Sequence, residues 1–150
     1  MFGMPLTSHC ICGYTRDDTF PSTKELCIRS YQLAFVTPLA VYNSDSADLY
    51  PYTDDKQVAA AVTSNLKARL ALMTYQRTEL YKISKRGGAL NRPLFSEYPD
   101  QSYYTPDMVD TMMYGSALKV DFVYDLGVYT KEVLVPENSY WLSIFDAKLV

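Results

Sequence analysis

Hydrophobic residues recur at helical spacing across residues 56–86, the longest periodic stretch in the chain. Steps of four or three residues keep side chains on one stripe of a helix. The stretch therefore predicts a long helix, or a helix pair, whose stripe packs into the core and has no metal or cofactor role. Gly87 and Gly88 are expected to end it. The residues of this predicted stripe are Val58, Val62, Leu66, Leu70 and Met73.

A strand and a shorter helix are predicted before this stretch. Residues 2–11 are apolar and rich in types that favour extended backbone, which indicates one buried strand, and a loop should follow. Ser22 and Glu25 have the spacing of a capping box, so a helix is expected to begin there and to end before Pro38. Residues 43–55 are polar and predict a loop. The predicted buried side of the helix comprises Leu26, Ile28, Tyr31 and Leu33.

The last third of the chain has the pattern of β-structure. Residues 118–124 alternate between apolar and polar types, as expected for a strand with one buried face. Further strands are predicted at residues 129–135 and 140–145, separated by turn-forming residues. The composition shifts near Gly115, so an α/β portion is expected to join a small β portion without a flexible linker.

Composition and charge exclude several classes of protein. The chain has 150 residues, of which 48% are hydrophobic and 21% charged, a balance typical of folded domains. The formal charge is -3, so no basic surface for nucleic acid is expected. No apolar run approaches the length of about 20 residues that a membrane span needs. The 14 tyrosines suggest many half-buried side chains but name no function.

The three cysteines allow at most one internal disulfide. A bridge between Cys10 and Cys12 would be strained, which leaves Cys12–Cys27 and Cys10–Cys27 as alternatives. His9 with the three cysteines could supply four metal ligands, but zinc sites usually come as two spaced pairs, so no metal site is expected. Neighbouring residues of an extended segment point to opposite sides, which disfavours a His9–Cys10 nucleophile pair. No cofactor is expected either.

Five stretches resemble motifs of one enzyme family, in the family's order and at compatible spacing. The first holds FGMPL and ICGY, where the family has FGIPM and ADICGF. ELCIR, followed by QL and a proline, is similar to ELCxRWxQLGAFYPF, and RPLFSEYP is similar to MRPLFFEFP. MYGSALKV is similar to FLxGxALLVxPV, and VLVP with a following tryptophan is similar to VYLPxGxWYD. The family is the glycoside hydrolases of family 31, the α-glucosidases, sucrase-isomaltase and their relatives.

The resemblance implies a fold and a division of the chain. In the family this region is the end of a (β/α)8 barrel followed by the start of a β-sandwich domain. The implied fold class is therefore α/β, a partial TIM barrel of the last strand–helix units and then antiparallel β-sandwich strands. Residues 1–114 would belong to the barrel and residues 115–150 to the following β domain.

The resemblance also implies that this chain has no catalytic residues. A retaining glycosidase needs two carboxylates about 5 Å apart, one as nucleophile and one as acid and base. In the family both lie upstream of the segment that begins this chain. Asp17 with Asp18, and Asp54 with Asp55, are neighbours in predicted loops and do not replace them. The chain is expected to be inactive by itself, and the alternatives are a structural or interaction subunit and a weak carbohydrate-binding module.

Four positions correspond by resemblance to the family's sugar pocket. The Asp that holds sugar hydroxyls falls on Cys10, and the aromatic that closes the same motif falls on Tyr14. The Arg and His of the family's MRNHN stretch fall on Val41 and Asn43. A thiol is only a weak donor and acceptor, and valine has no donors. The resemblance therefore implies α-glucoside as the partner but a degraded pocket at these positions.

The remaining implications concern bridges, location and packing. Cys12 and Cys27 match positions that are disulfide-bonded in secreted family members, which implies this bridge and an origin in the secretory pathway, although this chain carries no targeting signal. Arg92 is expected to pair with Glu97. A protein partner or the remainder of the barrel should cover the strand edges and apolar helix faces that this chain leaves exposed. The tyrosines that could form a carbohydrate-stacking platform are Tyr103, Tyr104 and Tyr140.

Overall fold

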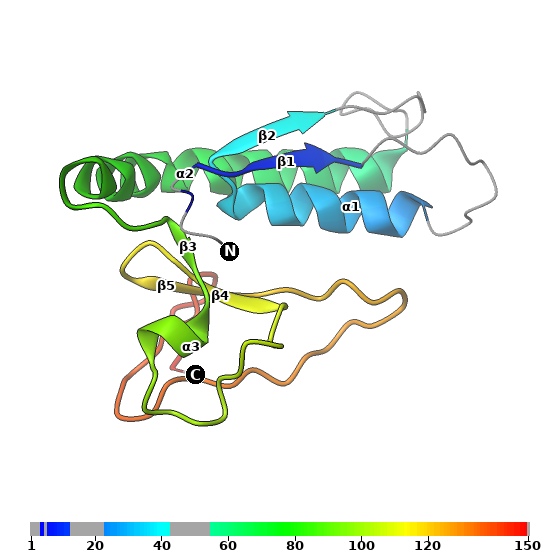
Figure 1. The fold of residues 1–150 in the computed structure, drawn as a ribbon. Coiled ribbons are helices and arrows are strands. Elements are labelled where there is room, and N and C mark those ends of the chain that lie inside the picture. The colour runs from blue at the N-terminus through cyan, green and yellow to red at the C-terminus, as the bar shows by residue number, and fades with distance from the viewer. Residues whose placement is uncertain (1–3, 5, 13–22, 43–54, 150) are drawn as a thin grey trace.

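The computed structural model describes residues 4, 6–12, 23–42 and 55–149. Two parallel strands, β1 (Ser8–Ile11) and β2 (Leu39–Tyr42), lie on one side of the molecule (Figure 1). Helix α1 (Thr23–Leu33) and the 3-10 helix η1 (Ala34–Val36) connect them, which makes a βαβ unit. The long helix α2 (Lys56–Arg86) follows and packs beside α1.

The β1–β2 sheet has one covered and one open face. Ser8 lies opposite Leu39 and Ile11 opposite Tyr42, so the strands are in register. Ile11 packs with residues of α1 and α2, and Tyr42 lies against the same core. Because successive side chains alternate between faces, Cys10 and Val41 are on the other face and are exposed. A strand is therefore confirmed over the last four residues of the predicted range 2–11, but only Ile11 in it is buried, and β2 was not predicted.

Helix α1 ends before Pro38, as predicted, but its buried face differs in part from the prediction. Cys27 and Tyr31 are buried and Leu26 is exposed. Leu26 lies about 100° around the helix from Cys27, away from the sheet. The predicted cap residue Ser22 is outside the described residues. Its expected partner Glu25 instead pairs with Arg29 and accepts a hydrogen bond from the backbone of Gly127.

The predicted long helix is confirmed as a single element of 31 residues. The Asp55 side chain accepts hydrogen bonds from the backbone N–H groups of Gln57 and Val58, which caps the first turn. Gly87 has a φ of 76° and donates its N–H to the carbonyl of Ile83, which ends the helix. No described helix combines the length and apolar composition that a membrane span requires.

The predicted apolar stripe of α2 is buried only at its beginning. Val58 and Val62 are buried, but Leu66, Leu70 and Met73 are exposed. Repeated steps of four advance about 40° beyond a full turn each time, so such a stripe rotates away from the core. The inward face instead continues through Arg69 and buried Glu79, whose side chains bond to other parts of the fold.

The rest of the chain forms a small antiparallel sheet with irregular segments around it (Figure 1). The sheet order is β3-β4-β5, and a short helix α3 follows β3. β4 is buried along its whole length and packs against α2. The predicted division at residues 114 and 115 stays a prediction; these positions end β4 and begin the turn before β5. The elements are β3 (Asn91–Arg92), α3 (Leu94–Glu97), β4 (Thr111–Tyr114) and β5 (Leu118–Asp121).

The C-terminal strands are predicted correctly only in part. β5 covers the first four residues of the predicted strand at 118–124. No strand forms at residues 129–135 or 140–145, both within the described part; Leu142 makes one isolated bridge, with Leu149. A strand requires a neighbour for its backbone hydrogen bonds, and these segments lie at the surface, where Tyr129 and Tyr140 are 84% and 92% exposed. Antiparallel strands after an α/β region are nevertheless present, as predicted.

Candidate functional site

The candidate pocket positions lie toward the carboxyl ends of β1 and β2. Cys10 is directly opposite Val41 in the ladder, and both are exposed on the open face of the sheet. Tyr14 and Asn43 lie outside the described residues, but in the sequence they follow β1 and β2 closely. In barrels of parallel strands, ligands bind at this end of the strands. The structure therefore brings two of the four predicted positions together.

The two described positions have little capacity to bind hydroxyl groups. Val41 has no polar side-chain atom, and the Cys10 thiol is a weak donor and acceptor. Asp55 is committed elsewhere, since it caps α2 and pairs with Lys24 at 2.6 Å. The hydrogen bond from Lys24, followed by those from Val58 and Gln57, holds the pKa of Asp55 below its ordinary value. Asp17, Asp18 and Asp54 are outside the described residues.

His9 lies on the opposite face of β1 from Cys10. Its Nε2 atom is 2.7 Å from the Ser30 hydroxyl of α1, and the same hydroxyl accepts the backbone N–H of Cys12 at 2.9 Å. Burial lowers the pKa of His9, against the smaller raising effect of its contact with Ser30. The imidazole thus helps to fix β1 against α1, and a His9–Cys10 nucleophile pair is not formed.

A disulfide joins Cys12 to Cys27 and ties the end of β1 to α1, with a Cα–Cα distance of 4.4 Å. Cys10 is exposed and takes no part in it. The bridge removes two of the four ligands that a metal site with His9 would use. No group of three or more potential metal ligands occurs among the described residues.

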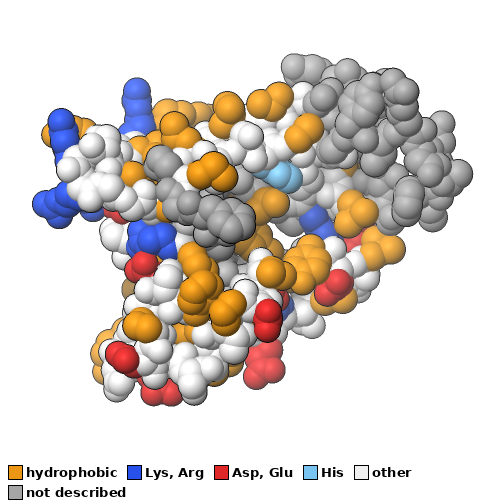
Figure 2. All heavy atoms as spheres, viewed as in Figure 1, with side chains coloured by type: hydrophobic (Ala, Val, Ile, Leu, Met, Phe, Trp, Pro, Cys, Tyr) orange, Lys and Arg blue, Asp and Glu red, His pale blue; other side chains and the backbone are white. Residues whose placement is uncertain are grey.

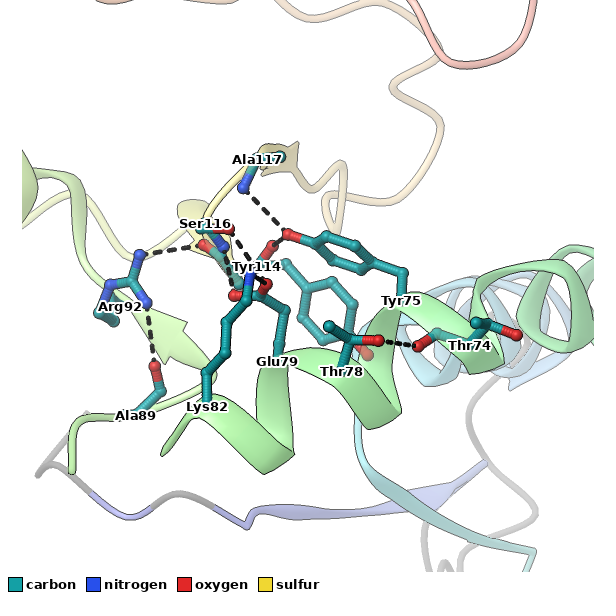
Figure 3. A network of polar contacts seen from close by, with 11 residues as sticks. Thr74, Tyr75, Thr78, Glu79, Lys82, Ala89, Arg92, Tyr114, Ser116 and Ala117 are labelled. Carbon is teal, nitrogen blue, oxygen red and sulfur yellow. Dashed lines mark hydrogen bonds and ion pairs between the residues drawn. The ribbon is translucent and has the colours of Figure 1, made fainter. Parts of the chain in front are cut away.

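A network of hydrogen bonds joins α2 to the turn after β4 (Figure 3). Sequence patterns did not predict it. Glu79 is buried and accepts hydrogen bonds from the backbone N–H of Ser116 at 2.9 Å and from its hydroxyl at 3.1 Å. The Tyr75 hydroxyl donates to the carbonyl of Tyr114 at 2.9 Å and accepts the N–H of Ala117 at 2.9 Å. One turn of α2 therefore holds the β4–β5 turn.

Glu79 is charged in this network. Burial acts to raise the pKa of Glu79, but hydrogen bonds from Lys82 and Ser116 outweigh it and hold the pKa below its ordinary value. Lys82 lies 2.6 Å from the carboxylate. Since these bonds use both carboxylate oxygens, Glu79 acts as a structural anchor between α2 and the sheet.

The predicted Arg92–Glu97 ion pair is confirmed, with 2.5 Å between Nε and Oε1. The guanidinium also donates to the carbonyls of Ala89 and Gly115 at 3.2 and 3.0 Å. Figure 3 shows Arg92 and Tyr75 on opposite sides of the β4–β5 turn. Its contacts are therefore with the chain itself, in agreement with a structural rather than a ligand-binding role.

A second set of contacts ties α1 to residues 123–128. Arg29 pairs with Glu25 and donates to the carbonyls of Val123 and Val128 at 2.6 and 2.7 Å. The N–H of Gly127 donates to Glu25 at 2.9 Å. This bond and the neighbouring Arg29 hold the pKa of Glu25 below its ordinary value.

The tyrosines proposed as a stacking platform are in different surroundings. Tyr104 is only 5% exposed, packs against Tyr103 with ring centroids 4.6 Å apart, and donates to the carbonyl of Leu134 at 3.2 Å. Burial raises the pKa of the Tyr104 hydroxyl. A stacking platform that includes Tyr104 is excluded, because its buried ring has no face for a sugar, whereas Tyr140 is exposed.

Comparison with known proteins gives a consistent result for the whole chain. The family model of the glycosyl hydrolases family 31 TIM-barrel domain matches residues 1–79. The lysosomal alpha-glucosidase of Mus musculus is 31% identical over 144 residues, which are 94% of this chain and 14% of that protein. The alpha-glucosidase of Hordeum vulgare is 29% identical, over 99% of this chain and 16% of that protein.

Solved structures share the fold. A family 31 sulfoquinovosidase from E. rectale, in complex with an aza-sugar inhibitor, matches 99% of this chain with a TM-score of 0.84 and 23% identity. A family 31 dextranase of Flavobacterium johnsoniae, in complex with isomaltotriose, matches 93% with a TM-score of 0.80 and 22% identity. The chain spans 22% and 17% of these two structures. It therefore corresponds to a minor part of each relative.

Proposed function

The chain belongs to family 31 of the glycosyl hydrolases, and on that premise we propose that it forms one wall of an α-glycoside pocket without catalysing hydrolysis by itself. In this proposal β1, α1, β2 and α2 are the last units of a partial (β/α)8 barrel. Residues 115–150 begin the following β-sandwich domain. Their lineage is that of the α-glucosidases, two of which are among the relatives described above.

The pairing of Cys10 with Val41 is the observation that carries this proposal. By resemblance these positions correspond to the Asp and the Arg with which family members bind sugar hydroxyls. Their place on the open face of parallel strands is where a barrel has its interior. A thiol and an isopropyl group at the same place offer little for a sugar to bind, so recognition by the family's geometry is weakened here.

The chemistry of the reaction supports inactivity of the chain alone. Retention requires a nucleophilic carboxylate and an acid about 5 Å from it. By resemblance both residues lie upstream of this segment in family members. Among the described carboxylates of this part of the chain, Glu25 pairs with Arg29, Asp55 caps α2, and Glu79 holds the β4–β5 turn.

An activity assay tests this proposal. The purified chain is incubated with 4-nitrophenyl α-D-glucopyranoside, and the barley α-glucosidase serves as the positive control. We expect no release of 4-nitrophenol above the rate of buffer alone. Turnover that stays with the chain through purification, and is abolished by a carboxylate substitution within it, would contradict the proposal.

The open face of β1 and β2 favours a second candidate, a structural or interaction subunit. Leu39 and Val41 are exposed there, and Figure 2 shows hydrophobic side chains gathered over these strands. The interior of a complete barrel is filled with packed side chains. A partner that supplies further strands would bury this face and satisfy the open strand edges.

We also propose that the protein originates in the secretory pathway. The Cys12–Cys27 disulfide supports this location, because such bridges persist in oxidising compartments. Two relatives carry the names lysosomal alpha-glucosidase and intestinal sucrase-isomaltase. Alkylation in denaturant without reductant should label one cysteine of the purified chain, and three labels would contradict the bridge.

A further inference from the structure

A cavity of about 720 Å³ lies between α1, the start of α2 and residues 123–129. Figure 1 shows the last of these segments running alongside α1. The cavity is on the face of α1 that points away from Cys27 and Tyr31, and therefore away from the β1–β2 sheet. Its volume is within the range of small-molecule sites in proteins. Its position makes it separate from the pocket proposed at Cys10 and Val41.

The charged groups around the cavity neutralise one another. Arg29 pairs with Glu25 and also donates to the carbonyls of Val123 and Val128. Lys24 pairs with Asp55 at 2.6 Å. Since each cation at the wall already has its anion, the cavity offers no unpaired charge to an ionic ligand.

Three neutral polar side chains at the wall have capacity left for a ligand. The side-chain amides of Gln32 and Gln57 form no hydrogen bond with the described residues, and each supplies donors and an acceptor. Tyr129 is 84% exposed and presents a ring with a hydroxyl at its edge. Leu126 and Val128 add apolar surface beside it. The wall thus combines amides with an aromatic and aliphatic surface.

We propose that this cavity binds a short neutral oligosaccharide. Sugar rings carry hydroxyls that donate and accept at once, which matches the two amides, and C–H faces that pack against an aromatic ring. In this arrangement Gln32 and Gln57 bind hydroxyls, and Tyr129 covers one sugar face. The absence of unpaired charge selects against phosphorylated or carboxylated sugars. This site is independent of the proposed function and does not require the barrel pocket.

Nuclear magnetic resonance titration of the chain with maltotriose tests the proposal, because the side-chain NH₂ signals of Gln32 and Gln57 report directly on the cavity. We expect saturable shifts of these signals at millimolar sugar. Tyr129→Ala should weaken binding at least about tenfold, the equivalent of 1.4 kcal/mol. Tyr81→Ala, at an exposed tyrosine of α2 outside the cavity lining, is the matched control and should leave the affinity unchanged. The amide spectrum of each variant shows whether it is folded.

Three results would overturn the proposal. One is the lack of saturable shifts in a folded chain. Another is shifts confined to Cys10, Val41 and neighbouring residues, which would place the sugar on the open face of β1 and β2 and support that site instead. The third is tighter binding of glucose 6-phosphate than of the neutral sugar, which would show that charge governs recognition. None of these results depends on whether the chain hydrolyses glycosides.

Discussion

Two tyrosines that meet where α2 contacts β4 differ in how their hydroxyls are bonded. Tyr75 donates to the carbonyl of Tyr114 and accepts the N–H of Ala117. The Tyr114 side chain is fully buried, and its own hydroxyl has no hydrogen-bond partner among the described residues. Burial raises the pKa of Tyr114 to about 12, which keeps the phenol neutral. The Tyr75 hydroxyl should therefore stabilise the fold, whereas the Tyr114 hydroxyl should not.

Tyr75→Phe and Tyr114→Phe form a matched pair that tests this difference. Tyr75→Phe leaves a carbonyl and an N–H without their partner, so it should lower the free energy of unfolding by about 1 to 2 kcal/mol. Tyr114→Phe removes a buried hydroxyl that bonds to nothing, so it should be neutral or slightly stabilising. Urea unfolding followed by circular dichroism measures both. Equal destabilisation by the two variants would contradict the network in Figure 3.

Gly115 is required by the same contact. Its φ is 63°, and a Cβ there would lie 2.4 Å from the Tyr75 hydroxyl and 2.7 Å from the Glu79 Cγ. Gly115→Ala should therefore cost more than the roughly 1 to 2 kcal/mol of left-handed strain alone. Gly127→Ala is the control, because φ is 72° there and a Cβ meets nothing within 4 Å. Urea midpoints that fall equally in the two variants would exclude a steric role for this contact.

At the level of elements, α2 shows both what sequence patterns can predict and where they fail. Its ends follow from Asp55 and Gly87, since a cap side chain and a left-handed glycine are local signals. Its buried face was misassigned because it includes polar Arg69 and Glu79, which bond to segments distant in the sequence. Apolar spacing alone cannot identify a face whose polar members are satisfied by tertiary contacts.

Substitutions on the two sides of α2 test the corrected face. Val62 is 2% exposed within the first core, so Val62→Ala should destabilise by roughly 1 to 3 kcal/mol. Leu70 is 62% exposed, so Leu70→Ala should change stability by less than about 0.5 kcal/mol. Thermal unfolding distinguishes them. A larger loss for Leu70→Ala would show that the outer face of α2 is covered in solution.

Glu79 should also make stability depend on pH. Its pKa in the folded chain is below its ordinary value of 4.5, so the charged form stabilises the fold above that pH. This stabilisation is lost as the pH falls through the folded pKa, because the unfolded chain takes up the proton first. Glu79→Gln should flatten the fall in unfolding free energy below pH 4.5, compared with the parent chain. An unchanged slope would mean that Glu79 is not charged in the fold.

For the whole molecule, the sequence predicts the lineage better than the architecture. Short motifs such as ICGY and RPLF carry the family resemblance, and the family model and the shared fold support it. β2 was missed because four residues after a proline give too little periodicity. The segments predicted as strands at residues 129–135 and 140–145 find no neighbouring strand within the described chain. Pairing depends on what else is present, which a local pattern cannot show.

The charge of the molecule is also unevenly distributed. Helix α2 contains Lys or Arg at residues 56, 67, 69, 77, 82, 85 and 86 but only one acidic residue, Glu79. Acidic side chains are visible over the lower part of the molecule in Figure 2. Such a distribution can orient molecules as they associate, in a manner that salt screens. This distribution of charge does not account for the open face of β1 and β2, where the apolar side chains of Leu39 and Val41 are exposed.

We propose that further strands from a partner complete the open β1–β2 sheet of this chain. Light scattering coupled to size-exclusion chromatography, with a hydrophobic dye added in parallel, tests it most directly. We expect the chain to elute as an oligomer or to bind the dye strongly, because the sheet face with Leu39 and Val41 is otherwise open to water. A folded monomer that binds little dye would contradict it.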